Sequence, residues 1–133
     1  MNKTVSPFDE LFEFNKITLA LKKVIERNSW DQEAIMPTGA LADRAEEQAS
    51  LMIIAHKRQT SNEFSDLLDS VKIERLSKTQ LRQVSLMRKE LVRALKVPNE
   101  LIGALAKETT LAHSGWIDAR KDNDFEQFLP QFT

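Results

Sequence analysis

Two histidines are the first residues to consider for chemistry, because an imidazole can bind a metal ion or transfer a proton near neutral pH. His56 and His113 are far apart in the chain, and neither has a second histidine four residues away. The helical zinc motif His-Glu-x-x-His is therefore absent. Two isolated histidines with scattered carboxylates could in principle bind a metal ion. We expect instead that both form interhelical or surface hydrogen bonds, and we assign no catalytic, metal-binding or cofactor-binding residue.

Other catalytic patterns are also missing from the sequence. There is no cysteine, and hence no thiol nucleophile, thiolate metal site or disulfide. Ser114 is adjacent to His113 and so points in a different direction around a helix, and there is no Gly-x-Ser-x-Gly elbow or glycine-rich phosphate loop. Acidic residues do occur in close pairs, which are common on solvated, capped helices. These pairs are Asp31 with Glu33, Glu46 with Glu47, and Asp122 with Asp124.

The segment 30–37 is the most distinctive part of the chain, because a tryptophan stands beside two acids just before a proline. In a break between long helices, these side chains could line a pocket. The structural interpretation, which we favour, is that Trp30 fills the junction between two helices. Asp31 or Glu33 would then accept a backbone N–H or pair with Arg44.

A basic stretch occupies residues 72–96, with eight basic residues against two acidic ones in a chain of net charge −1. The basic residues are Lys72, Arg75, Lys78, Arg82, Arg88, Lys89, Arg93 and Lys96. One interpretation is a nucleic-acid-binding face, since phosphate contacts dominate such affinity. The other is a solvated helix that pairs with the acidic helices around it. We favour the second and predict no nucleic-acid partner, because neither a stacking aromatic residue nor a known nucleic-acid motif accompanies the charge.

The elements that must position these residues are predicted to be helices. The 133 residues include only three glycines and four prolines, too few turn residues for an all-β fold. Signals for helix starts are Ser6 with Pro7 and Asp9, Thr38, Ser61 or Asn62, Ser77 with Gln80, Pro98, and Asn123 with Glu126. Apolar residues at helical spacing predict helices over about 7–28, 39–59, 62–71, 78–96 and 98–121, and a further helix that starts at 123. The prediction is an all-α fold of five or six helices packed as an irregular bundle.

The sequence also carries no signal for a membrane or for secretion. The longest apolar run, residues 51–55, is far shorter than the roughly 20 residues that a membrane span requires. No apolar segment follows a basic start, so we expect no signal peptide. A net charge near zero gives no general attraction to anionic lipid. We therefore predict a cytoplasmic protein with no membrane partner.

Several separated strings resemble the N-terminal region of the carboxypeptidase Taq family. The first is Trp30-Asp31-Gln32-Glu33-x-x-Met36-Pro37-x-Gly39, followed by Arg44-Ala45-x-x-Gln48 and His56. Further along are Val97-Pro98-x-Glu100-Leu101 and Trp116-x-x-Ala119-Arg120-x-x-Asn123-Asp124-Phe125-x-x-Phe128-x-Pro130. The resemblance covers nearly all of the chain, and strings that keep their order are more specific than any one alone. The residues that mainly carry it, which we expect to be mostly structural, are Trp30, Asp31, Gln32, Glu33, Met36, Pro37, Gly39, Arg44, Trp116, Arg120, Asn123, Asp124 and Phe125.

The resemblance implies an α-helical, metal-dependent carboxypeptidase that removes C-terminal residues from peptides in a deep groove, commonly as a homodimer. Its metal, zinc or cobalt, would be held by the histidines of His-Glu-x-x-His and a later glutamate, none of which lies in the region that this chain resembles. The resemblance therefore implies that residues 1–133 form a single helical N-terminal region, part of the wall or lid beside the groove, without the catalytic region.

The leading hypothesis is a truncated or fragmentary member of this family that is inactive without the metal site. It would associate with itself or with the missing catalytic region, and peptide would be a substrate only in the full-length context. A capped, phenylalanine-rich helix that starts at 123 and soon stops suggests an interrupted element. The alternative is a free-standing helical interaction module of the same origin, which would bind itself, a full-length relative or a peptide.

Overall fold

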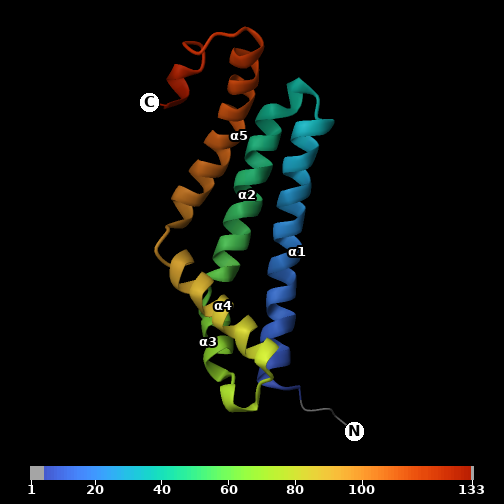
Figure 1. The fold of residues 1–133 in the computed structure, drawn as a ribbon, viewed down its shortest axis with the longest axis vertical. Coiled ribbons are helices and arrows are strands. Elements are labelled where there is room, and N and C mark those ends of the chain that lie inside the picture. The colour runs from blue at the N-terminus through green and yellow to red at the C-terminus, as the bar shows by residue number, and fades with distance from the viewer. Residues whose placement is uncertain (1–4, 133) are drawn as a thin grey trace.

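The computed structural model describes residues 5–132, and in this range the chain forms five α-helices, three short 3-10 helices and no strand (Figure 1). The α-helices are α1 (Pro7–Ala34), α2 (Leu41–Gln59), α3 (Asn62–Ser70), α4 (Lys78–Ala94) and α5 (Asn99–Lys121). The 3-10 helices are Thr38–Ala40, Ile73–Arg75 and Leu129–Phe132. The predicted all-α fold is confirmed. Residues 1–4, part of the start that shows no signal-peptide pattern, and Thr133 lie outside the described residues.

Three of the helix starts follow the predicted capping chemistry. The Ser6 hydroxyl accepts the Asp9 N–H while the Asp9 carboxylate accepts the Ser6 N–H, which forms a complete capping box. Ser77 and Gln80 form the same arrangement at the start of α4. Ser61 rather than Asn62 caps α3, because its hydroxyl accepts the Phe64 N–H. Local side-chain hydrogen bonds therefore fix where these helices begin.

The junction between α1 and α2 differs from the prediction. Helix α1 continues through Trp30 to Ala34 instead of ending near residue 28. The backbone leaves the helix only at Ile35 and Met36, whose N–H groups both donate to the Asp31 carbonyl, and Pro37 then holds an extended conformation. Thr38 is not a side-chain cap for α2; it begins a 3-10 turn. The break is thus short and lies directly before the proline.

The C-terminal segment also differs, because Asn123 ends a helix instead of starting one. Asn123 has a φ of 54°, and its N–H donates to the Arg120 carbonyl. The Asp124 N–H donates to the Ala119 carbonyl, which completes a Schellman motif at the end of α5. Asp124 Oδ1 then accepts the N–H groups of Glu126 and Gln127. The chain therefore turns sharply, and residues 129–132 form a 3-10 helix instead of the predicted α-helix.

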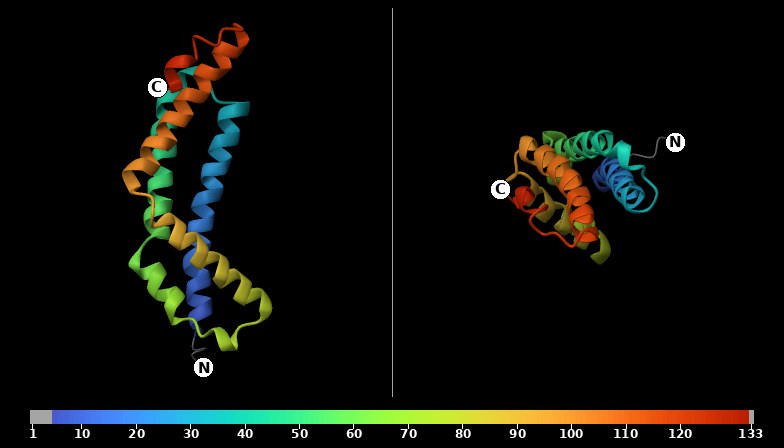
Figure 2. Two further views of the ribbon diagram at one scale, coloured as in Figure 1. Left: turned by 60° about the vertical axis from the view of Figure 1, so that its left-hand side comes forward. Right: turned by 90° about the horizontal axis from the view of Figure 1, so that it is seen from above.

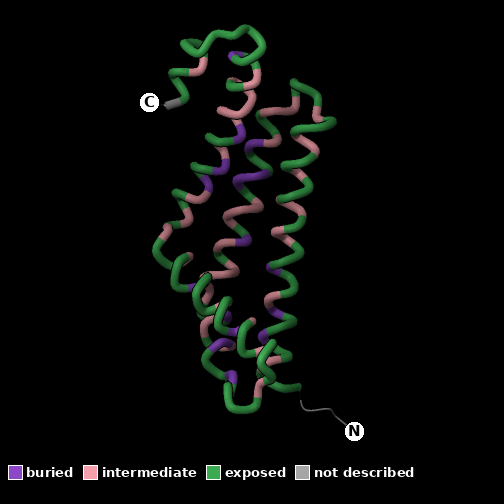
Figure 3. Tube along the Cα trace, in the orientation of Figure 1, coloured by how far each residue is buried: buried purple, intermediate pink, exposed green. Residues whose placement is uncertain are grey.

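The apolar core is concentrated at the lower end of the molecule in Figure 1, where α3 and α4 pack against the first half of α1. Its buried side chains are Leu11, Phe14, Phe64, Leu68, Val71, Val84 and Leu91. Figure 3 shows the buried positions following the contacts between helices and the exposed positions covering the outside. Phe12 and Ile17 on α1 are apolar but exposed, whereas the polar Thr18 is buried. Periodicity identified the helix but not which of its apolar residues meet the core.

Helix α2 lies between α1 and α5, and its contact with α5 is built from small residues (Figure 2). Ala45 and Ala49 on α2 are buried, whereas Ala42 is exposed. On α5, Gly103 is buried so close to Ile53 that an added Cβ would lie 2.6 Å from Ile53 Cδ1. Such small residues bring the backbones together and leave little room for larger side chains.

A charged contact joins the same two helices at their surface. The Lys107 ammonium on α5 donates to the Glu46 carboxylate on α2. This hydrogen bond and the negative charge of Glu46 raise the pKa of Lys107.

None of the helices within residues 5–132 combines the length and apolar character needed to cross a membrane.

Candidate functional site

The residues singled out by the sequence gather mainly at the upper end of the molecule, where the end of α1, the start of α2 and the C-terminal half of α5 meet (Figure 1). Arg44 is the central cation of this junction. Its Nη1 donates to the Asn28 carbonyl at 2.5 Å and its Nη2 to Asp31 Oδ2 at 2.6 Å. Its Nε lies 3.2 Å from Glu47 Oε2. The predicted pairing of Asp31 with Arg44 is confirmed, and it fastens α2 to the last turns of α1.

Two glutamines extend this polar junction across the helices. Gln48 is buried on α2, and its Nε2 donates to Ser29 Oγ at 2.9 Å and more weakly to the Ile25 carbonyl at 3.4 Å. Gln32 Nε2 reaches the Thr110 carbonyl of α5 at 3.5 Å, the outer limit for such a bond. Gln48 Oε1 has no hydrogen-bond partner among residues 5–132. Amide side chains thus connect α1 to α2 and to α5.

Glu33 does not pair with Arg44; it faces His113 on α5. The distance from Glu33 Oε1 to His113 Nε2 is 2.6 Å, but the approach does not have hydrogen-bond geometry. Contact at this distance becomes an ion pair when the imidazole is protonated. The His113 ring also lies 5.7 Å from the Trp116 ring, centroid to centroid. The expected hydrogen bond of His113 is therefore not formed among the described residues, and the ring contacts a carboxylate on α1 instead.

His56 forms the interhelical hydrogen bonds that the sequence predicts. Its Nδ1 lies 2.7 Å from Asn99 Oδ1 and its Nε2 lies 3.1 Å from the Ala94 carbonyl. Both partners belong to the α4–α5 junction, so His56 ties the end of α2 to that turn. Each ring nitrogen is engaged with a protein oxygen, which leaves neither free to bind a metal in this arrangement.

The arrangement at the junction can bind polar groups but does not form a metal centre. A pocket of about 250 Å³ opens between α1, α2 and α5, and Gln32, Glu33, Gln48, Thr109 and His113 contribute to its wall. Within residues 5–132, no group of three or more His, Asp or Glu side chains is placed to hold a metal ion. The residues present therefore do not fit the metal that the family resemblance implies, and no catalytic step can be derived from them.

A second cluster contains the C-terminal residues that the sequence singled out. Arg120 stacks over the Trp116 ring, with its guanidinium carbon 5.2 Å from the ring centroid. The Phe125 and Phe128 rings meet edge to face at 6.5 Å. Together with Asn123 and Asp124, which close α5, these residues line a shallow cavity of about 230 Å³. Their common role in this structure is to shape the end of α5.

The four remaining residues of the first string form no side-chain hydrogen bond or ion pair with the part of the chain that the structure describes. Trp30 is 63% exposed, so the expectation that it fills the helix junction is wrong. Its helix continues past the predicted break, which turns the indole outward. Met36 and Pro37 form the short connection, and a Cβ on Gly39 would meet no atom within 4 Å. Space alone does not require glycine at that position.

Sequence reasoning found Asp31 and Arg44 but missed the partners supplied by distant helices. His113 and the Thr110 carbonyl belong to α5 and are 80 and 78 residues away from the Glu33 and Gln32 side chains of α1 that they meet. The Asn28 carbonyl that Arg44 binds carries no side-chain signal at all. For the contact between Glu33 and His113, the only signal in the sequence was that an acidic side chain and an imidazole can pair.

With this geometry in place, comparison with known proteins identifies the family. The model of a family described as carboxypeptidase Taq (M32) metallopeptidase matches residues 10–133. The match includes almost the whole chain, so the chain belongs to this family of metallopeptidases.

Two curated relatives are both called thermostable carboxypeptidase 1. The one from Thermus thermophilus is 28% identical over 127 residues, which cover 92% of this chain and 25% of the relative. The one from Pyrococcus furiosus is 28% identical over 102 residues, which cover 76% of this chain and 20% of the relative. The chain thus spans a quarter or less of the length of these relatives. No solved structure matches it significantly.

Proposed function

We propose that this chain supplies the N-terminal helical wall beside the substrate groove of a metal-dependent carboxypeptidase and does not hydrolyse peptides by itself. The observation that carries the proposal is the family match over residues 10–133 in a chain with only two histidines. Those histidines are engaged in separate contacts, one with Asn99 and Ala94 and the other with Glu33. Zinc- or cobalt-dependent chemistry would then belong to a part of the enzyme that this chain does not contain.

The exposed apolar residues of α5 support the proposal that this wall packs against another part of the enzyme. Leu101 and Leu105 are one helical turn apart and are 46% and 51% exposed. Trp116, further along the same helix, is 39% exposed. Exposed apolar residues that share a helix face are typical of surfaces that pack against another domain or protein. Under this proposal, the covering surface is the catalytic region of the peptidase.

Inactivity is tested by incubating the purified chain with N-blocked peptides and added Zn²⁺ or Co²⁺, with release of C-terminal amino acids measured by mass spectrometry. The expected result is no release above a metal-only control. Release that requires the chain and is abolished by a chelator would contradict the proposal, because it would require a metal site within these residues.

The wall role is tested with a chimera in which this chain replaces the matching N-terminal region of the Thermus thermophilus carboxypeptidase. We expect the chimera to release C-terminal residues in a metal-dependent manner, whereas the relative without this region should be inactive. A folded chimera that binds metal but has no activity would argue against an equivalent role. The same relative with its own N-terminal region serves as the control for assay conditions.

A free-standing interaction module is the second candidate, favoured by the same exposed leucines of α5. In that case two copies would cover Leu101 and Leu105 against each other. Sedimentation of the chain at high concentration would give a dimer that the double substitution Leu101→Gln/Leu105→Gln converts to monomer. A wild-type chain that stays monomeric throughout would remove this candidate and leave the wall proposal unaffected.

A further inference from the structure

The basic stretch at residues 72–96 has most of its positive charge unneutralised. Among the described residues, only Arg88 of the eight basic side chains forms an ion pair, with Asp69 Oδ1 at 2.7 Å. The expectation that this stretch pairs with the acidic helices around it is therefore wrong for the other seven. Their charge remains available for an anion from outside the chain.

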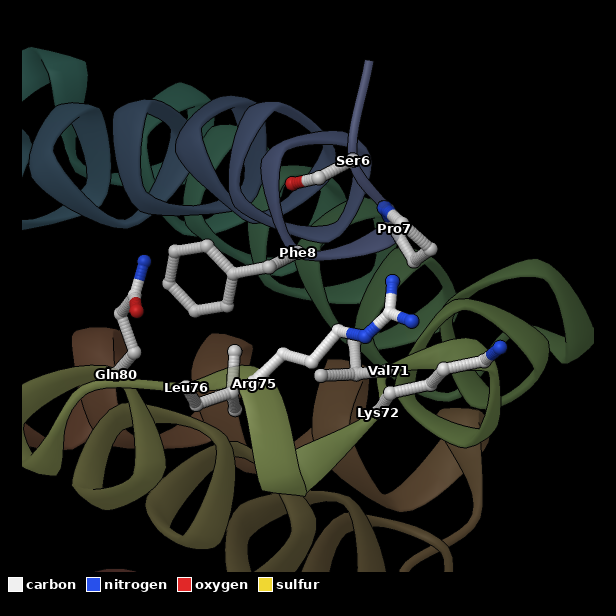
Figure 4. Close-up of a pocket in the computed structure, with 8 residues that line it drawn as sticks. All are labelled: Ser6, Pro7, Phe8, Val71, Lys72, Arg75, Leu76 and Gln80. Atoms are coloured by element: carbon white, nitrogen blue, oxygen red, sulfur yellow. The ribbon is translucent and has the colours of Figure 1, made fainter. Parts of the chain in front are cut away.

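Two of these cations, Lys72 and Arg75, border a cavity of about 250 Å³ at the lower end of the molecule. The cavity lies where the start of α1 meets the segment between α3 and α4 (Figure 4). Its apolar wall is formed by Pro7, Phe8, Val71 and Leu76. Val71 is a buried member of the core, and Phe8 and Leu76 pack against it, so the cavity reaches the edge of the core.

The polar side chains that border the cavity are those of Ser6, Lys72, Arg75 and Gln80. Figure 4 shows the Arg75 guanidinium extended toward Pro7, with Lys72 extending outward beside it and Gln80 near the Phe8 ring. At the start of α1, the Ser6 N–H is already bound by the Asp9 carboxylate and the Asp9 N–H by the Ser6 hydroxyl. Arg75 and Lys72 are therefore the groups that would meet an anion, because Asp9 and Glu10 in the first turn of α1 oppose the attraction of its helix dipole.

We propose that this cavity binds a small amphiphilic carboxylate, with its apolar chain against Phe8, Val71 and Leu76 and its carboxylate at Arg75 and Lys72. The volume is just below the roughly 300–1,000 Å³ of sites for drug-sized ligands, which suits a short alkyl chain or a single apolar side chain. A planar guanidinium matches a carboxylate through two parallel hydrogen bonds. Each methylene of the chain that is buried should tighten binding about fourfold.

This ligand class explains the site better than a nucleic acid does. A nucleic acid would need a row of cations and flat aromatic surfaces, and bases would gain little from a small apolar cavity. The carboxylate could belong to a free fatty acid or to the C-terminal residue of a peptide, because both join one negative charge to an apolar group. The proposal does not depend on the peptidase role, since it needs neither a metal nor turnover.

The test is a titration of the isotopically labelled chain followed by NMR, with sodium octanoate as the probe, kept below its micelle concentration. We expect shifts centred on the amides of Phe8, Val71 and Gln80. Octanol, which has the chain without the charge, and acetate, which has the charge without the chain, should each bind at least tenfold more weakly. N-acetyl-leucine serves as the peptide-like probe, and its affinity relative to octanoate assigns the source of the carboxylate.

Charge specificity is tested with the double variant Lys72→Gln/Arg75→Gln. Both residues are exposed, so the fold should persist, and octanoate affinity should fall at least fivefold while octanol binding is unchanged. The matched control, Arg82→Gln/Lys89→Gln, removes the same charge from exposed positions outside the cavity and should keep the wild-type affinity. Equal loss in both variants, or shifts spread over other apolar surfaces, would overturn the proposal.

Discussion

Replacing Arg44 by Met should reveal how strongly the polar junction holds α1 and α2 together. The Arg44 side chain is only 14% exposed and meets Asn28, Asp31 and Glu47. Methionine has a similar length and a good helix propensity, so the change removes the guanidinium without disturbing α2. The loss should therefore report the polar contacts.

The expected size follows from the exposure of each partner. The Asp31 carboxylate is 38% exposed, so water can replace part of its interaction, and this pair should contribute about 1 kcal/mol. The hydrogen bond to the Asn28 carbonyl should contribute about 1 kcal/mol more. Glu47 is 57% exposed and should contribute almost nothing. We expect the Arg44→Met substitution to lower the free energy of unfolding by about 2 kcal/mol.

Urea unfolding followed by far-UV circular dichroism measures this change, provided that the m-value is the same for both proteins. In a double-mutant cycle with Asp31→Asn, about half of the loss should disappear, because the Asn28 contact survives in the Asp31→Asn protein. Lys16→Met is the matched control, since Lys16 pairs with Glu13 and both side chains are about two-thirds exposed. A loss below about 0.5 kcal/mol for Arg44→Met, equal to the control, would refute the reasoning.

Two further substitutions test the packing. Leu68→Ala leaves a cavity at a fully buried core position and should lower the free energy of unfolding by about 2–5 kcal/mol in the same urea assay. Leu86 is 42% exposed, so Leu86→Ala should lower it by less than about 1 kcal/mol. Equal losses for the two variants would show that Leu68 is not a core residue. Gly103→Ala gains about 1 kcal/mol of helix propensity but forces the Ile53 end to move, so we expect little net change. Adding Ile53→Val removes the Cδ1 methyl that the new Cβ would meet. The coupling free energy between Gly103→Ala and Ile53→Val should then be stabilising by about 1 kcal/mol, and additive effects would show that Ile53 does not restrict this site.

The parts of the fold that were predictable are those decided within a few residues. Ser6 and Ser77 were correctly placed because a capping box needs only two side chains three positions apart. The end of α1 was predicted too early, because no residue between Asn28 and Pro37 breaks a helix and the actual end depends on the proline. Asn123 was misassigned for a related reason. Asparagine serves both helix starts and left-handed helix ends, and only the course of α5 decides between them.

The candidate site was predictable in its residue types but not in its pairings. Arg44 and Asp31 could be matched because they flank a single connection. Glu33 and His113 lie on α1 and α5, which both pack mainly against α2, so their contact depends on how closely α2 and α5 pack. That spacing is set by Gly103 and its small neighbours, whose influence cannot be read from the acids and histidines themselves.

The uneven construction of the molecule bears on its relation to the rest of a peptidase. Large apolar side chains join α1, α3 and α4 at the lower end, whereas α5 contributes none of the buried members of that core. It packs instead against α2 through small residues, and the Lys107–Glu46 contact and a polar contact from α1 add to this packing. Its exposed leucines would add the missing apolar contact once another surface covers them. Although α5 packs extensively against α2, it still presents an exposed apolar face, which is the feature that the proposed wall role needs.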